Sequence, residues 1–327
     1  MSIGVEVIIL TINGEDIEPC LSSVKASGLF LEDKLKITLV ADFADEKLKQ
    51  LCCKYNVNLL MLKAIPSVKR NFAVEKSEAE ILVFCDDDII VQPDWLKHLL
   101  THFKDVDVAV VGGPNLTPPN SSLREKCSGY IFASLLGGGS MSVRYKVVPK
   151  AISVKGEELI LCNMAIRKSA FKEVGGFPEN LYPGEENFLC WKIREKGYKL
   201  IYEPNAIVWH RRRPLFIPHL RQVFHYGFGR AKMIKMIPRS FKPIYLFPAL
   251  LVIGLPLGFI LAVFNSVIRL AYLLTVFSYF GAILASSIHI ALTNRSFKSF
   301  FLLIPGFILH HLSYGVGFLT CLIGGDK

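Results

Sequence analysis

The segment Ile81-Leu82-Val83-Phe84-Cys85-Asp86-Asp87-Asp88 decides the fold that we expect. Its five apolar residues predict a buried strand, and three carboxylates follow without a break. Because these carboxylates repel one another, we expect a divalent cation that carries pyrophosphate oxygens to compensate them. Asp86 and Asp88 alternate along an extended segment and can share one Mg²⁺ or Mn²⁺ ion. An acidic turn that caps the next helix is the structural alternative.

Around this segment, short β-rich apolar runs alternate with helical patterns. The expected strands are Val5 to Leu10, Leu35 to Ala41, Val57 to Leu62, Ile81 to Cys85 and Val106 to Val111, and the expected helices lie around Ile17 to Ser27, Asp45 to Tyr55, Val68 to Lys76 and Pro93 to Phe103. This order predicts an α/β fold with a mostly parallel, Rossmann-like sheet and ligands at the carboxyl ends of its strands. The sequence contains neither GxGxxG nor GxxxxGK[ST], which argues against a dinucleotide-dependent oxidoreductase and a P-loop enzyme.

The last third of the chain is strongly apolar. From Pro243 onward, the charged residues are Arg269, Arg295, Lys298, Asp326 and Lys327. Three stretches, Ile244 to Phe264, Val267 to Leu292 and Phe300 to Ile323, approach or exceed the roughly 20 apolar residues that span a bilayer. We expect three transmembrane helices, because a buried hairpin of a soluble protein would need a very large partner to cover helices that are apolar on every side.

A basic cluster precedes the first apolar stretch and accounts for most of the net charge of +10. Nine lysines and arginines lie between residues 211 and 242 without an acidic residue. Such a cluster is expected on the cytoplasmic side, where it meets anionic lipid, so we expect a cytoplasmic front domain and a C-terminal tip outside. The adjoining span argues against nucleic-acid binding.

Eight scattered cysteines indicate a reduced compartment, and Met1 to Thr11 lacks the features of a secretory signal.

Four motifs in this order resemble the family-two inverting glycosyltransferases of the GT-A fold, over about Val5 to Arg230. They are Val7-Ile8-Ile9-Leu10-Thr11-Ile12-Asn13, Val40-Ala41-Asp42, Lys69-Arg70-Asn71 and the strand that ends in Asp86-Asp87-Asp88. The resemblance implies a nucleotide-sugar donor, such as a UDP- or GDP-sugar, and a divalent cation. It implies these donor-binding residues: Leu10, Thr11, Asn13, Asp42, Arg70, Asn71, Asp86 and Asp87.

The second half of the front domain extends the resemblance. Cys162 to Lys168 and Val174-Gly175-Gly176-Phe177 resemble the strand and turn before the acceptor site, and Pro183-Gly184-Glu185-Glu186-Asn187 resembles the motif that holds the catalytic base. Glu186 takes the base position and Glu185 its neighbour, although either glutamate could serve. Without the resemblance, the two would simply complement a helix N-terminus.

His210 ends the apolar strand Ala206 to Trp209, where related enzymes often place a third metal or pyrophosphate contact. With Asp86 and Asp88 it completes the metal set that we expect, and a bystander at a strand end is the alternative. Asn163, Arg211, Arg221 and Arg230 are candidates for the acceptor or diphosphate. Plain membrane-surface charge is the alternative explanation for the arginines.

The expected organisation is a GT-A domain over residues 1–215, a basic juxtamembrane segment over 216–243 and a transmembrane region over 244–327. The expected function is inverting transfer of a sugar to a lipid-linked or membrane-proximal hydroxyl acceptor at the inner face of the cell membrane. A polyprenyl-phosphate sugar synthase and a non-catalytic sugar-nucleotide-binding scaffold are the alternatives. A transporter is not expected, because three spans are few for a pathway and no buried charge pair lies among them.

Overall fold

The computed structural model describes residues 4–324. Two of the charged residues noted in the apolar last third of the chain, Asp326 and Lys327, lie outside this range. The chain forms two compact units, each built from two segments. The first unit comprises Met1–Pro118 and Val143–Arg211, and the second comprises Pro119–Ser142 and Arg212–Lys327. The division expected from the sequence placed residues 119–142 in the front domain. They join the second unit because the helix that they form packs against the last helix of the chain.

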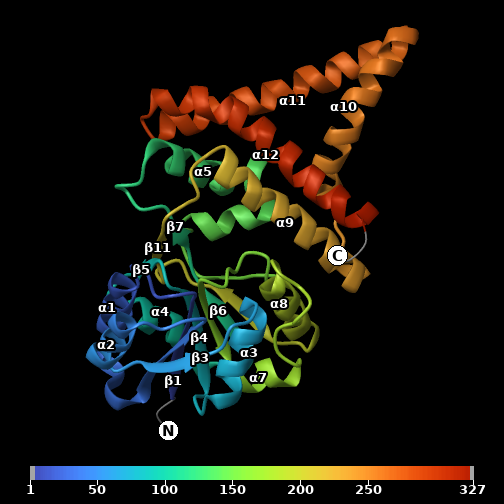
Figure 1. Ribbon diagram of the computed structural model, residues 1–327. Helices are drawn as coiled ribbons and strands as arrows, with labels where there is room; N and C mark the ends of the chain where they lie inside the picture. The colour runs from blue at the N-terminus through green and yellow to red at the C-terminus, as the bar shows by residue number, and fades with distance from the viewer. Residues whose placement is uncertain (1–3, 325–327) are drawn as a thin grey trace. The chain divides into compact units, whose positions relative to one another are not determined.

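An eight-stranded sheet forms the centre of the first unit (Figure 1). Its order is β3 (Asn58–Met61), β2 (Leu35–Ala41), β1 (Val5–Thr11), β4 (Ile81–Asp86), β9 (Asn163–Arg167), β6 (Val108–Gly112), β10 (Lys199–Tyr202) and β8 (Ile152–Ser153). Strands β3, β2, β1 and β4 are parallel, as are β6 and β10, whereas β9 runs antiparallel to both of its neighbours. The expected mostly parallel α/β sheet is confirmed.

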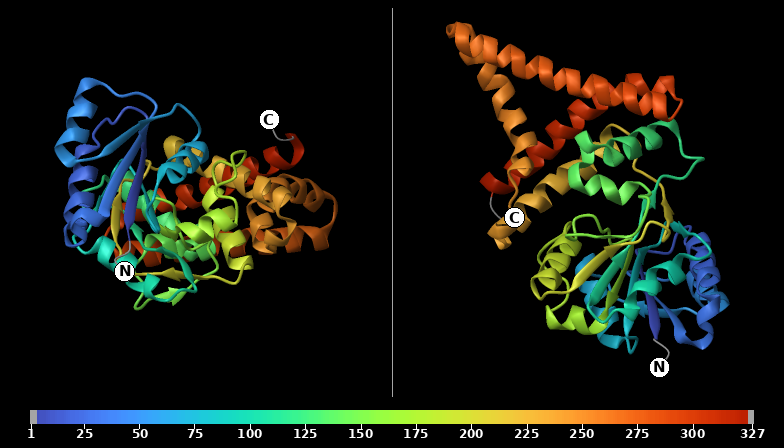
Figure 2. Two further views of the ribbon diagram at one scale, coloured as in Figure 1. Left: turned by 90° about the horizontal axis from the view of Figure 1, so that it is seen from below. Right: turned by 180° about the vertical axis from the view of Figure 1, so that it is seen from behind.

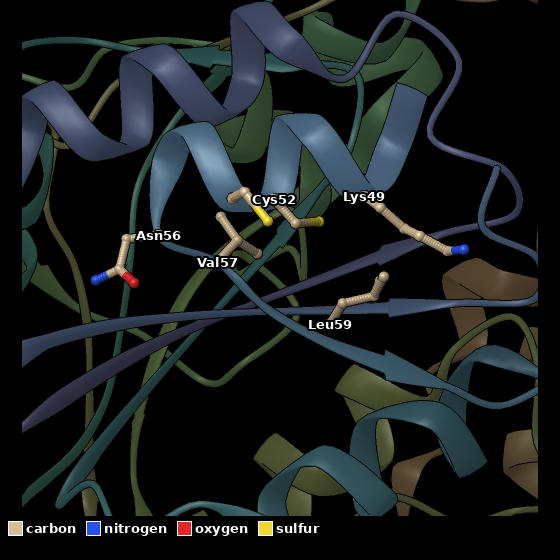
Figure 3. A pocket seen from close by; sticks show the side chains of 6 residues that line it. Lys49, Cys52, Asn56, Val57 and Leu59 are labelled. Carbon is tan, nitrogen blue, oxygen red and sulfur yellow. The ribbon is translucent and has the colours of Figure 1, made fainter. Parts of the chain in front are cut away.

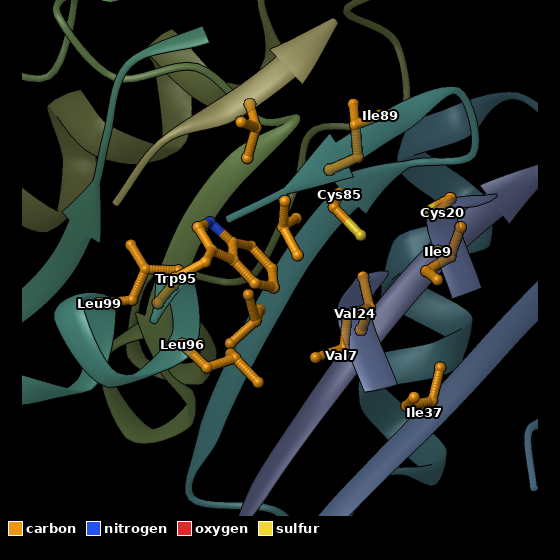
Figure 4. Packing of buried hydrophobic residues seen from close by; sticks show 14 of the residues in the cluster. Val7, Ile9, Cys20, Val24, Ile37, Cys85, Ile89, Trp95, Leu96 and Leu99 are labelled. Atoms are coloured by element: carbon orange, nitrogen blue, oxygen red, sulfur yellow. The ribbon is translucent and has the colours of Figure 1, made fainter. Parts of the chain in front are cut away.

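Helices cover both faces of this sheet, because its central strands are apolar on both sides. The helices are α1 (Glu18–Ser27), α2 (Glu46–Tyr55), α3 (Pro66–Lys76), α4 (Trp95–Thr101), α7 (Lys168–Glu173) and α8 (Glu185–Glu195). Val7 and Ile9 of β1 belong to one core cluster and Ile8 to the other. Figure 4 shows the first cluster, in which the ring of Trp95 lies among aliphatic side chains between α4 and the sheet.

A second, three-stranded sheet follows the acidic segment. It contains β5 (Ile89–Val91), β11 (Val208–His210) and β7 (Asn115–Leu116), with β11 in the middle. The expected helix start at Pro93 is slightly wrong: β5 comes first, and α4 begins at Trp95 after Asp94. The short strand turns the chain directly after Asp88 and pairs it with the segment that carries His210.

The second unit is helical. It contains α5 (Leu123–Ala133), α6 (Leu135–Gly138), α9 (Ile217–Met236), α10 (Phe247–Phe264), α11 (Ser266–Thr293) and α12 (Phe297–Gly324), with 3₁₀ turns at Pro238–Ser240 and Pro243–Leu246. Helices α9 and α12 run side by side in Figure 1 and in the right-hand view of Figure 2. They approach closely at Gly317, where an added Cβ would overlap the carbonyl group of Phe224.

Among the described residues 4–324, three helical segments are long and apolar enough to cross a membrane. They are Pro243–Phe264, Ser266–Thr293 and Phe297–Gly324, with mean hydropathies of 2.5, 1.8 and 1.5 over their most apolar windows. The three expected apolar stretches therefore form helices of the expected length.

Candidate functional site

The carboxyl ends of β1 and β4 bring the acidic segment to the rim of the sheet. Leu10 pairs with Asp86 in the parallel register, and Cys85 pairs with Asn163 of the antiparallel strand β9. Thr11, Asp86 and Cys162 therefore meet at one edge, although 151 residues separate the first from the last along the chain. This is the edge at which an open α/β sheet binds its ligands.

The three aspartates point in different directions. Asp86 lies 3.9 Å from a guanidinium nitrogen of Arg70. Asp87 accepts a hydrogen bond of 2.5 Å from the hydroxyl group of Thr11. Asp88 lies 3.0 Å from Nε2 of His210. The three carboxylates thus have three different partners: Asp87 faces Thr11 at the end of β1, Asp86 faces Arg70, and Asp88 faces His210.

Strand pairing explains how His210 reaches the acidic segment from far along the chain. In the antiparallel register of β5 and β11, His210 is opposite Ile89, the residue that follows Asp88. Its other ring nitrogen, Nδ1, lies 3.5 Å from Nδ2 of Asn115. The structure therefore places His210 beside Asp88, where the sequence predicted a metal contact.

Glu185 and Glu186 open α8, but their environments differ. Gly184, with φ at +113°, begins this helix, and both carboxylates lie in its first turn. Glu185 is buried and accepts a hydrogen bond of 2.9 Å from Arg70. Glu186 is half-buried and accepts hydrogen bonds from Arg144 at 3.3 Å and from Asn187 at 3.1 Å. Arg70 thus links Glu185 to Asp86 across the site.

Burial and mutual repulsion raise the pKa values of three acids in this cluster, Glu185, Asp86 and Asp87. Burial, together with the neighbouring Glu186 carboxylate, raises the pKa of Glu185 to about 7 against the opposing effect of Arg70. Burial also raises the pKa of Asp86, although 37% of its side chain is exposed, and Asp88 and Glu186 add to the shift. Burial raises the pKa of Asp87 as well, while the Thr11 hydroxyl group opposes it. The cluster holds more negative charge than its own cations neutralise.

The turns after β1 and β2 are joined by a lysine that the site assignment from the sequence did not include. Lys69 is buried; its ammonium group donates to the carbonyl oxygen of Thr11 at 2.8 Å and pairs with the carboxylate of Asp42. Asn13 is exposed and accepts from the backbone of Glu15. Lys69 therefore fixes Thr11 relative to Asp42, and both are residues that the resemblance assigns to donor binding.

Two of the predicted ligand contacts, Asn163 and Asn71, make hydrogen bonds within the protein. The side-chain amide of Asn163 is fully buried; it accepts from Trp95 Nε1 at 2.8 Å and donates to the carbonyl groups of Pro114 and Ala206. Asn71 exchanges two hydrogen bonds with the backbone of Phe177. These partners hold both amides in place, and ligand contact by Asn71 and Asn163 stays a prediction.

The three predicted arginine contacts are distributed over both units. Arg211 is exposed at the end of the first unit. Arg221 is exposed on α9, whereas Arg230 of the same helix is buried. The guanidinium group of Arg230 lies over the ring of Tyr245 at 4.6 Å and contacts the sulfur of Met141. These three side chains therefore have different surroundings.

The site suits a divalent cation. Ligand atoms of Asp86, Cys162 and His210 lie within 4.8 Å of one another, and Asp88 adjoins the same imidazole. Carboxylate oxygens and an imidazole nitrogen are ligands that Mn²⁺ accepts, and Mg²⁺ accepts the oxygens. The raised pKa values of Asp86 and Asp87 also indicate carboxylates that a cation would stabilise in the charged form. Cys162 is the member of this group that the metal prediction omitted, although the sequence motif contains it.

An open depression elsewhere on the first unit lacks this chemistry. Figure 3 shows it beside α2, where Lys49, Cys52 and Asn56 face Val57 and Leu59. Its lining residues are one lysine, two cysteines, one asparagine and two aliphatic residues. We assign it no role, because that set provides neither a carboxylate pair nor a paired acid and base.

Comparison with known proteins agrees with this geometry. Residues 6–175 match the family model described as glycosyl transferase family 2. The pre-mycofactocin glycosyltransferase of Mycobacterium tuberculosis is 27% identical over 190 residues, which cover 55% of this chain and 37% of that protein. An O-antigen chain rhamnosyltransferase of Salmonella typhimurium is 29% identical over 144 residues, which cover 43% of this chain and 44% of that one.

A poly-β-1,6-N-acetyl-D-glucosamine synthase of Staphylococcus aureus is 25% identical over 60% of this chain and 46% of its own. The chain thus spans less than half the length of these curated relatives. Among solved structures, the mannosyltransferase PcManGT from Pyrobaculum calidifontis, in complex with GDP-Man and Mn²⁺, aligns with a TM-score of 0.59. The alignment covers 99% of this chain and 88% of that one at 17% identity, and it supports the fold.

Proposed function

The chain belongs to glycosyl transferase family 2, and we propose that it transfers a sugar with inversion from a nucleotide-sugar donor to a hydroxyl acceptor at a membrane. The observation that carries this proposal is the bridge from Glu185 through Arg70 to Asp86. The guanidinium group of Arg70 has the glutamate pair on one side and the acidic segment on the other, and the acceptor and the donor would meet there.

Donor binding is assigned to the rim formed by β1, β2 and β4. Thr11, Asp42 and Asp87 would contact the nucleoside of a UDP- or GDP-sugar, with Lys69 fixing the first two. Asp86, Asp88 and His210 would hold Mg²⁺ or Mn²⁺. When bound, that cation neutralises the diphosphate and so stabilises it as a leaving group.

We assign the general base to Glu186. Its side chain is 12% exposed and accepts a charge-assisted hydrogen bond from Arg144, whereas the side chain of Glu185 is 3% exposed and packs against Arg70. In the proposed reaction, the acceptor hydroxyl oxygen bonds to C1 of the sugar, and its proton passes to Glu186. The bond from C1 to the diphosphate oxygen breaks, and the nucleoside diphosphate keeps that electron pair. Glu185 positions Arg70 rather than taking part in proton transfer.

The acceptor that we propose is lipid-linked or membrane-proximal, at the cytoplasmic face. Three apolar helical segments follow the catalytic unit, and the basic residues between 211 and 242 precede them directly. An anchored enzyme meets amphiphilic acceptors at the bilayer surface, where such molecules are concentrated. Cations beside apolar helices also favour the cytoplasmic side.

The test is transfer by the full chain in membranes, with a panel of UDP-, GDP- and dTDP-sugars and candidate acceptors. Glu186→Gln is expected to lower transfer by about 100-fold or more, which is the usual contribution of a general base, without weakening donor binding. Glu195→Gln is the matched control, because Glu195 lies at the far end of the same helix and its side chain is 46% exposed. Full activity of Glu186→Gln would contradict the assignment.

The same assay separates the alternatives. A product that is labile to mild acid, and that Glu186→Gln forms as well as the unmodified chain, indicates a polyprenyl-phosphate sugar synthase, since a phosphate oxygen needs no strong base. Donor binding without turnover for any acceptor indicates a sugar-nucleotide-binding scaffold.

A further inference from the structure

The C-terminal half of helix α12, from His310 to Cys321, is joined to α9. Glycines let the two backbones touch, because an added Cβ at Gly227 would overlap the Tyr314 carbonyl group and one at Gly317 would overlap that of Phe224. Polar side chains connect the helices on both sides of these glycines. Ser313 Oγ donates to the Leu220 carbonyl oxygen at 2.7 Å, and Lys235 Nζ donates to that of Cys321 at 2.7 Å. The two helices therefore share one environment.

Helix α9 is too polar for the hydrocarbon core of a bilayer. Within its 20 residues it carries four cationic residues, Arg221, Arg230, Lys232 and Lys235, and two histidines. Lysines near the end of a spanning helix can extend to the headgroups, but the side chain of Arg230, six residues before the end of α9, is buried within the protein. Charged side chains at such depth are costly in lipid. Because α12 packs against α9, α12 cannot enter the hydrocarbon core without taking these charges with it.

The middle of α12 is covered by α5 and α6, and α6 presents backbone carbonyl groups to it. His310 and His311 lie near the centre of this helix and contact the carbonyl oxygens of Gly137 and Leu136 in α6, at 3.2 and 2.9 Å. His310 also contacts His219 of α9 at 3.0 Å. Helix α5, which precedes α6, begins Leu123-Arg124-Glu125-Lys126 and packs on α12 as well. A helix at mid-bilayer would not be expected to carry such neighbours.

Helices α10 and α11 have the opposite character. Only 17% and 11% of the residues in their most apolar windows are buried within the protein, against 44% for α12. Their exposed side chains are mostly large and apolar, for example Ile253, Phe259 and Phe277. The connection between them is polar: the side chain of Asn265 caps α11 by accepting from the backbone of Val267 and Ile268. An apolar surface of this extent needs a hydrocarbon partner.

We propose that α10 and α11 cross the bilayer as a hairpin, whereas α12 lies at the membrane surface beside α9. The 22-residue segment Pro243–Phe264 and the 28-residue α11 reach about 33 and 42 Å, enough for the roughly 30 Å core. Both ends of the described second unit then lie on the cytoplasmic side, in contrast to the three spans and outside C-terminus expected from the sequence. This inference rests on the proposed membrane attachment.

Tags at the two ends of the full chain test the topology. An epitope at each terminus is exposed to protease in sealed spheroplasts and in inside-out vesicles of the expressing cells. Both tags are expected to be protected in spheroplasts and cleaved in inside-out vesicles. A C-terminal tag cleaved in intact spheroplasts would overturn the inference while leaving membrane attachment in place. A chain that remains in the soluble fraction would contradict both the inference and the attachment.

Depth measurements test α12 directly. Ile253→Trp in α10 and Leu309→Trp in α12 form a matched pair, because each residue is near the middle of its helix and is 49% and 37% exposed. In vesicles of phospholipids brominated deep in the acyl chain, Ile253→Trp fluorescence is expected to be quenched more strongly than that of Leu309→Trp. The signal of the three natural tryptophans, all in the first unit, is subtracted with the parent chain. Equal deep quenching of both variants would overturn the inference.

Discussion

Arg70 donates a hydrogen bond of 2.9 Å to the buried carboxylate of Glu185 and reaches toward Asp86 with its other nitrogen. The two residues are 115 positions apart, on α3 and α8, so this contact fixes one wall of the site relative to the other. The ring of Phe177 lies 5.9 Å from the same guanidinium carbon and adds a cation–π contact. Arg70 is therefore the residue on which the geometry of the site most depends.

Above about pH 7, where Glu185 is ionised, Arg70→Ala is expected to reduce the free energy of unfolding by about 3 to 5 kcal/mol, because it leaves this buried carboxylate without its cation. Transfer activity should fall with it. Chemical denaturation followed by circular dichroism in detergent measures the change. Lys36→Ala is the control, since Lys36 pairs with Glu78 at an exposed site and its loss should have little effect. Equal stability of Arg70→Ala and the unmodified chain would show that the bridge contributes nothing.

Glu185 makes stability depend on pH. Its pKa is raised from 4.5 to about 7 in the folded chain, so the folded state keeps a proton that the unfolded state has lost between these values. Stability should therefore fall as pH rises from about 4.5 to 7 and level off above it. Glu185→Gln removes this part of the pH dependence. Asp86 and Asp87, whose pKa values are also raised, still lower the stability as pH rises. Thermal unfolding at several pH values, without divalent cations, should give a shallower decline for the variant; identical slopes would contradict the assignment.

Lys69→Met should weaken donor binding more than it weakens the fold. The change leaves the Thr11 carbonyl group and the Asp42 carboxylate without their shared cation, so the turns after β1 and β2, which we propose to bind the donor, lose their fixed position. A loss of about 1 to 3 kcal/mol corresponds to a rise of about 5-fold to 150-fold in the donor Kd. Isothermal titration calorimetry with UDP and GDP measures it. Lys49→Met, at an exposed position on α2, provides the control and should bind the nucleotide normally.

Gly317→Ala tests the contact of α9 with α12. The added Cβ would overlap the Phe224 carbonyl group, so the helices must separate, and we expect a loss of about 1 to 3 kcal/mol. Gly254→Ala is the matched variant, because Gly254 lies in apolar α10 with open space at the same position. The thermal midpoint in detergent should fall for the first change and stay nearly constant for the second. A similar response of both would mean that the close approach is unimportant.

Much of the first unit could be predicted from its sequence. Short β-rich runs bounded by helical patterns predicted the ends of β1, β2, β4 and their helices to within about two residues. They could do so because each of these strands is apolar on both faces. The position of His210 beside Asp88 followed from the resemblance, whereas its cause, the pairing of β11 with β5, did not. Two- and three-residue strands such as these depend on tertiary contacts rather than on a local pattern.

The residues that the sequence left out or placed differently share one property: their positions depend on partners far away in the chain. Arg144 donates to Glu186 across 42 positions and has no motif around it. Asn163 was assigned to the acceptor because of its place in a motif, but Trp95, 68 positions away, uses its amide. Residues 119–142 were placed in the front domain because they lie within its sequence, whereas α5 finds its apolar partners on α12. No single stretch of sequence contains these contacts.

The central claim, that Asp88 and its neighbours bind a donor through a divalent cation, is tested most directly by calorimetric titration of UDP- and GDP-sugars with and without Mn²⁺. The unmodified chain should bind one donor class tightly with Mn²⁺ and at least about tenfold more weakly in EDTA. Asp88→Asn should bind it weakly in both conditions, with its circular dichroism spectrum unchanged. Equal affinity with Mn²⁺ and with EDTA, or normal Mn²⁺-dependent binding by Asp88→Asn, would contradict the claim.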